Sequence, residues 1–137
     1  MRTKVETRDA TDLVLQLVGR MHQHFAEVAL SIGLTPPQMG VLKNLDDSSP
    51  MGRLASELHC DASNITWMVD RLEERGLVER TPDPLDRRVK RLVLTDSGRK
   101  LRRDIERRLR AGIPGMENLG AEERRTLGRL LERMLDA

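Results

Sequence analysis

A short stretch in the middle of the chain carries polar side chains at helical spacing. Ser63, Asn64 and Thr66 have hydroxyl and amide groups, which can hydrogen-bond to the edges of DNA bases or to phosphate oxygens. Trp67 and Arg71 follow on the same helical face, and an arginine there is well suited to phosphate. Because the major groove of a duplex is wide enough for one helix, this face is a candidate reader of DNA sequence.

A second group of candidate residues lies further along the chain and is basic. Arg87, Arg88 and Lys90 follow a segment that contains two prolines, which is typical of a turn. An arginine at the tip of a hairpin can enter the minor groove, where the negative potential of DNA is concentrated. Asp86 is predicted to orient the Arg88 side chain through a charge-assisted hydrogen bond.

The charges of the chain are segregated. The whole sequence has 24 Lys and Arg against 22 Asp and Glu, which gives a formal net charge of +2. Residues 71–110 hold 14 of the basic residues and 8 of the acidic ones, so this stretch carries +6 and the remainder carries −4. Such a pattern indicates either a polyanionic partner or an arginine-rich helical face in contact with water, and the charge alone leaves both interpretations open.

The polar stretch lies within a pattern typical of a helix-turn-helix. Leu54, Ala55 and Leu58 are predicted to form the inner face of one short helix. Asp61 is the predicted N-cap of a second helix, which ends at Gly76. The inner face of this second helix comprises Ile65, Met68, Val69 and Leu72. Two short helices joined by a turn of about three residues match the helix-turn-helix layout.

The segment after Gly76 changes from a helical period to a period of two. The alternating positions are Val78, Arg80, Val89, Arg91, Val93 and Thr95. Residues 81–88 separate the two halves and form the proline-containing turn. This pattern predicts a β-hairpin with a charged tip, whereas residues 46–50 are predicted to be a loop.

The N-terminal part of the chain is predicted to form a long amphipathic helix and a shorter one. The apolar stripe of the first helix is Val14, Leu17, Val18, Met21, Phe25, Val28 and Ile32, and Gly33 can end it. Thr35 and Gln38 form a predicted capping box, with Pro36 at the first helical position of the next helix. That helix is predicted to bury Met39, Val41, Leu42 and Leu45.

Two helices are predicted after the hairpin. Thr95 caps the first, which Pro114 and Gly115 end, and the second begins near Ala121. The apolar stripe of the last helix is Leu127, Leu130, Leu131, Met134 and Leu135. The stripes at the two ends of the chain are more than a small domain can cover alone, so we expect them to pack against a second copy.

The predicted fold class is therefore mainly α with a small β-hairpin wing. We expect residues 35–95 to form a winged helix-turn-helix that binds DNA. Residues 1–34 form an N-terminal helix for dimerisation, and residues 96–137 form C-terminal helices for dimerisation.

Residues 61–80 resemble the recognition helix and first wing strand of the MarR family (multiple antibiotic resistance regulators). Residues 86–98 are similar to the wing tip, second strand and next helix start of that family, and residues 35–42 resemble its second helix. The resemblance implies a homodimeric regulator that docks on an inverted repeat and represses transcription by blocking polymerase. It also implies that Asn64, Thr66 and Trp67 face the major groove and that Arg88 enters the minor groove.

One departure from the family concerns Trp67, whose position is often small or basic in its members. We expect the indole to pack either on the sugar–phosphate backbone or on a thymine methyl group, so base preference cannot be borrowed from relatives.

A small-molecule effector is predicted to bind between the terminal helices and the winged unit and to release the DNA. The residues expected to line its cleft are Arg20, His24, Phe25 and Met39. Cys60 is interpreted as a small buried residue, with oxidant sensing as the alternative. His22 and His24 diverge by roughly 200° on a helix, so they are interpreted as surface or ligand-pocket residues, with zinc binding as the alternative. The predicted protein has no metal and no cofactor.

Other functional classes fit the sequence less well. An enzyme would need a nucleophile beside a base, or paired carboxylates in a cleft, and the three His, single Cys and scattered Ser form no such pattern. A helical protein-interaction module without DNA binding explains the terminal stripes but not the basic hairpin. The single cysteine, the polar N-terminus and the absence of a long apolar run predict a cytoplasmic protein.

Overall fold

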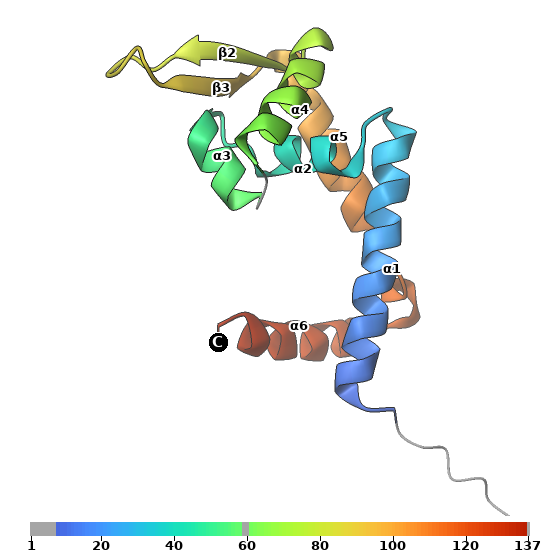
Figure 1. Ribbon diagram of the computed structural model, residues 1–137. Helices are drawn as coiled ribbons and strands as arrows, with labels where there is room; N and C mark the ends of the chain where they lie inside the picture. The colour runs from blue at the N-terminus through green and yellow to red at the C-terminus, as the bar shows by residue number, and fades with distance from the viewer. Residues whose placement is uncertain (1–7, 59–60, 137) are drawn as a thin grey trace, which may run out of the picture. The chain divides into compact units, whose positions relative to one another are not determined.

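The computed structural model describes residues 8–58 and 61–136, which form two compact units. Residues 25–111 make up one, the winged unit, and residues up to 24 together with those from 112 onwards make up the other, the terminal unit. The elements, labelled in Figure 1, are α1 (Ala10–Ser31), α2 (Pro36–Asn44), β1 (Ser48–Pro50), α3 (Met51–Glu57), α4 (Ala62–Glu74), β2 (Val78–Pro82), β3 (Lys90–Leu94), α5 (Asp96–Ala111), the 3-10 turn η1 (Met116–Asn118) and α6 (Ala121–Leu135). The predicted fold class, mainly helical with a hairpin wing, is confirmed.

The winged unit has a core made of aliphatic side chains from its helices and its sheet. The inner face of α4 is buried as predicted, through Ile65, Met68, Val69 and Leu72. The core also contains Met39, Val41, Leu42, Leu45, Leu54, Val78, Leu92, Leu94 and Ile105. Because one face of each element is committed to this core, the opposite faces of α4 and of the hairpin are left for solvent or a partner. None of the helices in the described ranges, 8–58 and 61–136, is long and apolar enough to cross a membrane.

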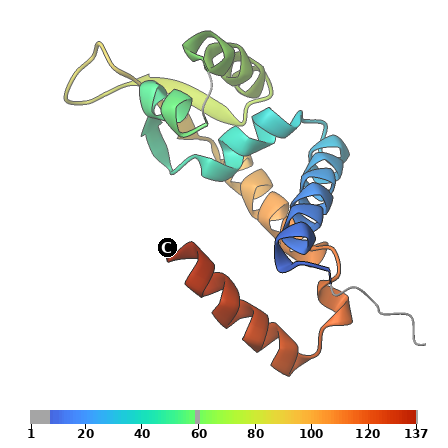
Figure 2. The ribbon, with the colours of Figure 1, turned by 60° about the horizontal axis from the view of Figure 1, so that its bottom comes forward.

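The hairpin is the main part of a three-stranded antiparallel sheet with the order β1-β3-β2. Val78 pairs with Leu94 at one end of the hairpin, and Pro82 pairs with Lys90 at the other. The strand β2 therefore includes two residues, Thr81 and Pro82, that were predicted to belong to the turn. Figure 2 shows the loop between β2 and β3 projecting away from the helices of the winged unit.

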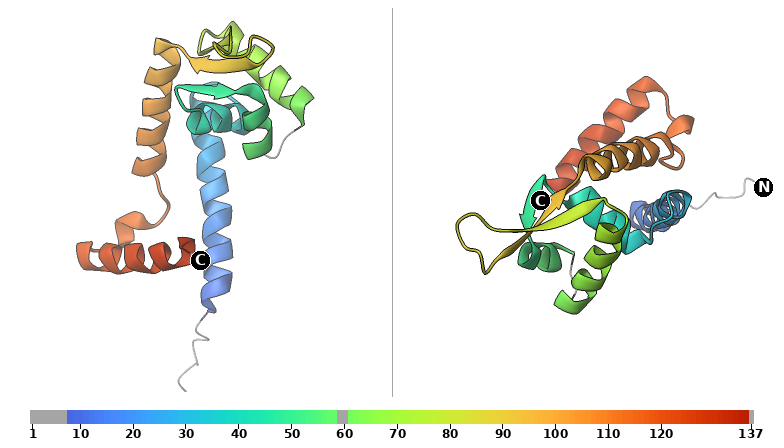
Figure 3. Two further views of the ribbon diagram at one scale, coloured as in Figure 1. Left: turned by 90° about the vertical axis from the view of Figure 1, so that its left-hand side faces the viewer. Right: turned by 90° about the horizontal axis from the view of Figure 1, so that it is seen from above.

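The prediction that residues 46–50 form a loop holds for residues 46–47 but was wrong for Ser48–Pro50, which form the edge strand β1 beside β3 (Figure 3). Ser48 is held by Arg91, whose Nε donates to the Ser48 hydroxyl at 2.7 Å and whose Nη2 donates to the Ser48 carbonyl at 3.0 Å. The segment has no alternating apolar residues. It becomes a strand because a distant part of the chain offers it a free sheet edge and a fixed arginine.

Local capping signals in the sequence agree with the structure. The Gln38 amide N–H donates to the Thr35 hydroxyl, and the Thr35 amide N–H donates to the Gln38 side chain, so the predicted capping box is formed. The Thr95 hydroxyl accepts from the Gly98 amide at 3.0 Å and caps α5 as predicted. The helix α5 ends at Ala111, slightly before the Pro114–Gly115 stop signal.

The start of α5 lies unusually close to the end of α4. The Thr95 amide donates to the Leu77 carbonyl at 3.1 Å, and the Thr95 hydroxyl donates to the Gly76 carbonyl at 2.6 Å. A Cβ atom added at Gly98 would lie 2.0 Å from the Leu77 carbonyl oxygen. Only glycine fits this contact, which fixes α5 against the turn between α4 and β2.

We predict opposite effects on stability for two glycine substitutions in the winged unit. Gly98→Ala should lower the free energy of unfolding by about 1–3 kcal/mol, because a rigid backbone carbonyl would have to move. Gly40→Ala, in the helix α2, has no atom within 4 Å of the added Cβ and should raise stability by up to about 1 kcal/mol through helix propensity. Urea unfolding at one protein concentration measures both. Equal effects would contradict the tight contact at Gly98.

Candidate nucleic-acid interface

The outward face of α4 presents all five residues singled out in its sequence. Ser63, Asn64, Thr66, Trp67 and Arg71 are exposed, while their neighbours on the inner face are buried. The helix begins directly after Asp61, which is the N-cap residue as predicted. Within the described ranges the Asp61 carboxylate makes no capping hydrogen bond, so the prediction that this side chain caps the helix was wrong.

Acidic residues in the second half of α4 are neutralised from within the winged unit. Arg80 on β2 contacts the Asp70 carboxylate at 2.5 Å through Nη2 and the Glu73 carboxylate at 3.2 Å through Nη1. The Arg80 amide also donates to Glu73 at 3.0 Å. Arg71 pairs with Glu74 at 3.0 Å. These contacts compensate the negative charges that would otherwise repel a polyanion, and they tie the wing to the helix.

The wing tip is closed by a carboxylate that accepts several hydrogen bonds. Asp83 accepts from the amides of Leu85 at 2.8 Å and Asp86 at 3.3 Å, and it forms an ion pair with Arg91 at 2.9 Å. The Asp83 amide in turn donates to the Val89 carbonyl at 2.9 Å. The amide of Leu85 and then the guanidinium of Arg91 hold the pKa of Asp83 below its ordinary value.

The proposed contact between Asp86 and the Arg88 side chain is corrected by the structure. The Asp86 carboxylate accepts from the backbone amide of Arg88 at 3.0 Å, and no bond to the guanidinium is formed in the described ranges. Asp86 therefore shapes the loop at Arg88 and leaves the arginine side chain uncommitted. The sequence could not distinguish these two acceptor arrangements, because both have the same two-residue spacing.

The basic residues of the hairpin fall into two groups. Arg80 and Arg91 are partly buried and are engaged in ion pairs. Arg87, Arg88 and Lys90 are exposed, and the part of the chain that the structure describes offers them no ion-pair partner. Sequence reasoning missed the structural role of Arg80, since its partners lie across a turn and share no periodicity with it. The unpaired charges are therefore concentrated at the wing tip.

Comparison with known proteins identifies the family. The model of the MarR family matches residues 34–90, which include the helix-turn-helix and most of the hairpin. The transcriptional repressor NicR of Pseudomonas putida is 33% identical over 143 residues, covering 94% of this chain and 86% of NicR. The chain belongs to the MarR family. The family suggested by the sequence is thus confirmed.

Other relatives match a shorter part of the chain. The repressor MdtR of Bacillus subtilis is 41% identical over 68 residues, which cover 48% of this chain and 44% of MdtR. The regulator YsmB of the same organism is 33% identical over 81 residues, covering 58% of this chain and 56% of YsmB. The matched part thus spans about half the length of these two relatives.

Solved MarR structures share the fold over nearly the whole chain. Apo MarR from Escherichia coli is 26% identical, with a TM-score of 0.80, and the match covers 93% of this chain and 96% of that one. A mutant of the same protein in complex with operator DNA is also 26% identical, with a TM-score of 0.67 and coverages of 91% and 92%. The second match shows that this fold, in that protein, is compatible with bound operator DNA.

Of the four residues predicted to line an effector cleft, two belong to the terminal unit and two to the winged unit. That they form one cleft stays a prediction. Arg20 lines a cavity of about 400 Å³ within the terminal unit, and the His24 ring packs closely against Gly112. In the winged unit, Phe25 is partly buried against the core, and Met39 is fully buried in it, so Met39 presents no surface to a ligand. Within the described ranges no group of three His, Cys, Asp or Glu could hold a metal, and Cys60 lies outside those ranges.

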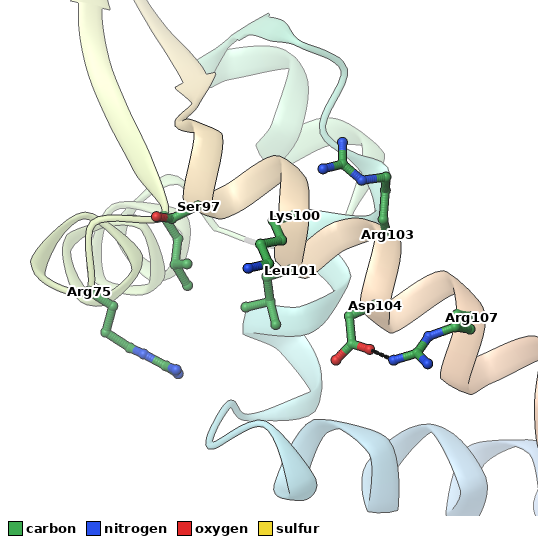
Figure 4. Close-up of a pocket in the computed structure, with 8 residues that line it drawn as sticks. Arg75, Ser97, Lys100, Leu101, Arg103, Asp104 and Arg107 are labelled. Atoms are coloured by element: carbon green, nitrogen blue, oxygen red, sulfur yellow. Dashed lines mark hydrogen bonds and ion pairs between the residues drawn. The ribbon is translucent and has the colours of Figure 1, made fainter.

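A separate cavity of about 600 Å³ lies within the winged unit and was not predicted. Figure 4 shows the residues around it, which come from the turn between α4 and β2 and from α5. Its apolar part is Leu77 and Leu101, and its remaining lining residues are Arg75, Ser97, Lys100, Arg103, Asp104 and Arg107. Arg107 and Arg108 both pair with Asp104 and lower the pKa of that carboxyl. No carboxylate in the described ranges pairs with Lys100 or Arg103, so the cavity is cationic.

We predict that the wing tip of this MarR-family protein keeps its shape well into acid. The lowered pKa of Asp83 means that its carboxylate stabilises the folded loop above the ordinary Asp range and that this stabilisation is lost as pH falls through the folded-state pKa. The amide proton shift of Leu85, followed by NMR, should therefore change only below the pH range in which an ordinary Asp carboxyl titrates. Asp83→Asn should abolish the transition. A Leu85 amide that titrates with the ordinary Asp pKa would contradict the hydrogen-bonded loop.

Proposed function

We propose that this chain is a sequence-specific, double-stranded DNA-binding transcription regulator that acts as a homodimer on an inverted repeat. The observation that carries the proposal is the charge arrangement of the winged unit. The exposed first half of α4 is polar and uncharged, while the unpaired cations of the hairpin are gathered at its tip. The uncharged face of α4 suits contacts with bases in the major groove, and the cationic wing tip beside it suits contacts with phosphates or the adjacent minor groove.

The two parts would divide the work of recognition. Ser63, Asn64 and Thr66 on α4 can hydrogen-bond to base edges or phosphates, and Arg71 borders this set. Arg87, Arg88 and Lys90 at the wing can reach phosphates or the minor groove, where charge and groove width matter more than base identity. Asp86 supports this arm through the backbone of Arg88.

Exposed apolar surface on the terminal unit supports dimerisation. In α1 the exposed large apolar residues of this unit are Leu13, Val14, Leu15, Leu17 and Val18, and in α6 they are Leu130, Leu131, Met134 and Leu135. At roughly 25 cal/mol per Å² of buried apolar surface, covering such stripes with a second copy is strongly favourable. Two winged units held by one dimer would then recognise two half-sites.

We propose repression as the direction of regulation, supported by the names of NicR and MdtR as repressors. BadR of Rhodopseudomonas palustris, which is 29% identical over 114 residues, is instead named a transcriptional activatory protein. We also propose release by a small-molecule effector. The predicted cleft at Arg20, His24, Phe25 and Met39 is one candidate site, and the cationic cavity of the winged unit is a second, because Leu77 and Leu101 with the unpaired Lys100 and Arg103 suit an organic anion. Such a ligand would act only through different affinities for the DNA-competent and incompetent states.

We predict that single substitutions separate the two DNA-contacting parts. Arg88→Ala should weaken binding to operator and random duplexes alike and should flatten the salt dependence by about one unit of slope per lost contact. Asn64→Ala should cost about 1–3 kcal/mol on the operator and little on random duplex. Titration of each variant against both duplexes at several salt concentrations measures these effects.

A third variant for this experiment is Asp86→Ala. It should weaken binding to both duplexes less than Arg88→Ala does, because it removes a hydrogen bond that holds the backbone at Arg88. Unchanged affinity and salt slope in Arg88→Ala would show that the wing does not touch DNA. Equal weakening on both duplexes by Asn64→Ala would make α4 a positioning element. Failure of the wild type to bind any duplex at low salt would favour the alternative, a helical protein-interaction module.

We predict that a charge placed on the α6 stripe separates the dimer. Leu130→Glu should give a monomer in sedimentation velocity at micromolar concentration, because a carboxylate would be buried in an apolar interface. Leu85→Glu, at the fully exposed wing tip, is the matched control and should leave the dimer intact. A wild-type monomer at that concentration would overturn the dimer proposal.

A further inference from the structure

We infer that Trp67, held by Arg71, reads the 5-methyl group of a thymine in each half-site of the operator. The inference rests on the proposed DNA-binding function and assigns base preference to one residue of α4. It also decides between the two roles that the sequence leaves open for this indole, packing on the sugar–phosphate backbone or on a thymine methyl.

The position of Trp67 shows that it is not a core residue. Its side chain is 54% exposed, whereas Ile65, Met68 and Val69 beside it are at most 5% exposed. The core of the winged unit is complete without an aromatic ring from α4. An exposed indole keeps a large apolar surface in water, so this surface is available to a partner.

One face of the indole is covered by a cation. The Arg71 guanidinium carbon lies 5.6 Å from the centre of the Trp67 ring, within the range of a cation–π contact. The same guanidinium donates from Nη1 to the Glu74 carboxylate at 3.0 Å. Arg71 is therefore anchored on both sides, and it limits the orientations that the indole can adopt.

The charge balance around the ring favours an apolar target over a phosphate. Glu74 compensates Arg71, and Arg80 compensates Asp70 and Glu73 on the next turns of α4. The residues that precede Trp67 on the same face are uncharged hydroxyl and amide side chains. A phosphate is best held by an unpaired cation, but the cation beside the ring, Arg71, is already paired with Glu74, and the indole itself presents mainly apolar surface.

In the major groove, the thymine C5-methyl group is the apolar feature of an unmodified base pair. A ring carried on a helix that enters this groove can bury the methyl without disturbing the hydrogen bonds of Asn64 or Thr66 to neighbouring base edges. The value of one methyl group in such a contact corresponds to about a fourfold change in affinity. The geometry thus predicts a preference that depends on the methyl group itself.

The test begins with selection of duplexes from a random-sequence library by the wild-type protein. Each thymine of the selected operator is then replaced singly by deoxyuridine, which removes only the methyl group. The wild type should lose about fourfold in affinity at one position of each half-site. Trp67→Ala should bind the two versions of that duplex equally. Circular dichroism should show an intact fold for this variant, because its side chain is mostly in solvent.

Two further variants sharpen the result. Leu85→Ala removes another exposed apolar side chain, at the wing tip, and should retain the fourfold methyl effect. Arg71→Ala frees the indole and should reduce the methyl effect without abolishing it, which is the mark of a positioning residue. At the same position, a 5-methylcytosine–guanine pair should be bound about fourfold more tightly than a cytosine–guanine pair by the wild type, and equally by Trp67→Ala.

The outcomes separate this inference from the function on which it rests. If a single operator is selected but no thymine methyl contributes, or if Trp67→Ala keeps the same methyl effect, the inference is wrong and sequence-specific binding stands. If the selection enriches no sequence at all, the proposed function itself fails. The assignment is supported if the wild type binds the methyl-bearing duplex more tightly and Trp67→Ala binds the two duplexes with equal affinity.

Discussion

The contact of Gly98 with the Leu77 carbonyl is the constraint on which the winged unit depends. It lets the start of α5 lie directly on the turn between α4 and β2, where the Thr95 side chain and amide bond to that turn. The end of the hairpin strand β3 is therefore fixed next to the end of α4. Because the helix that presents the polar face and the wing that presents the cations meet at this point, their spacing is set first by this backbone contact.

Ion pairs add a second level of order between the same two elements. Arg80 links β2 to the carboxylates of α4, and Arg91 links β3 to β1 and to the wing turn. Exposed ion pairs contribute little to stability, but these arginines are partly buried and make several bonds each. They keep acidic residues from acting as free negative charges near a polyanion. Some arginines of the winged unit, such as Arg80 and Arg91, thus stabilise the fold, whereas others have no ion-pair partner within the described ranges and are available to a ligand or partner.

The sequence predicted those features that depend on local chemistry. The capping box at Thr35, the cap at Thr95, the buried face of α4 and the existence of the hairpin all follow from spacing and side-chain type, and the structure confirms them. Features that depend on distant partners were missed. The strand β1 forms because its backbone pairs with β3 and because Arg91 hydrogen-bonds to it. Arg80 pairs with carboxylates that lie on the other side of a turn.

Two finer errors in the site have the same origin. Asp86 was assigned to the Arg88 side chain, but its carboxylate accepts from the backbone amide of that residue at 3.0 Å. The cationic cavity of the winged unit combines residues from α5 and from the turn between α4 and β2, and no periodic signal connects them. The roles of Asn64, Thr66, Trp67 and Arg88 toward DNA stay predictions, since the fold places them on the surface without a ligand to define their contacts.

The internal compensation of charge has a consequence for how such a regulator would locate its target. Near the polar face of α4, Arg71 and Arg80 are matched by carboxylates, and the unmatched cations of the hairpin lie at the wing tip. Attraction to arbitrary stretches of duplex grows with the number of unmatched cations. A dimer built in this way would dissociate quickly from unrelated sequence, so its search would proceed by repeated encounters through solution more than by long sliding along the genome.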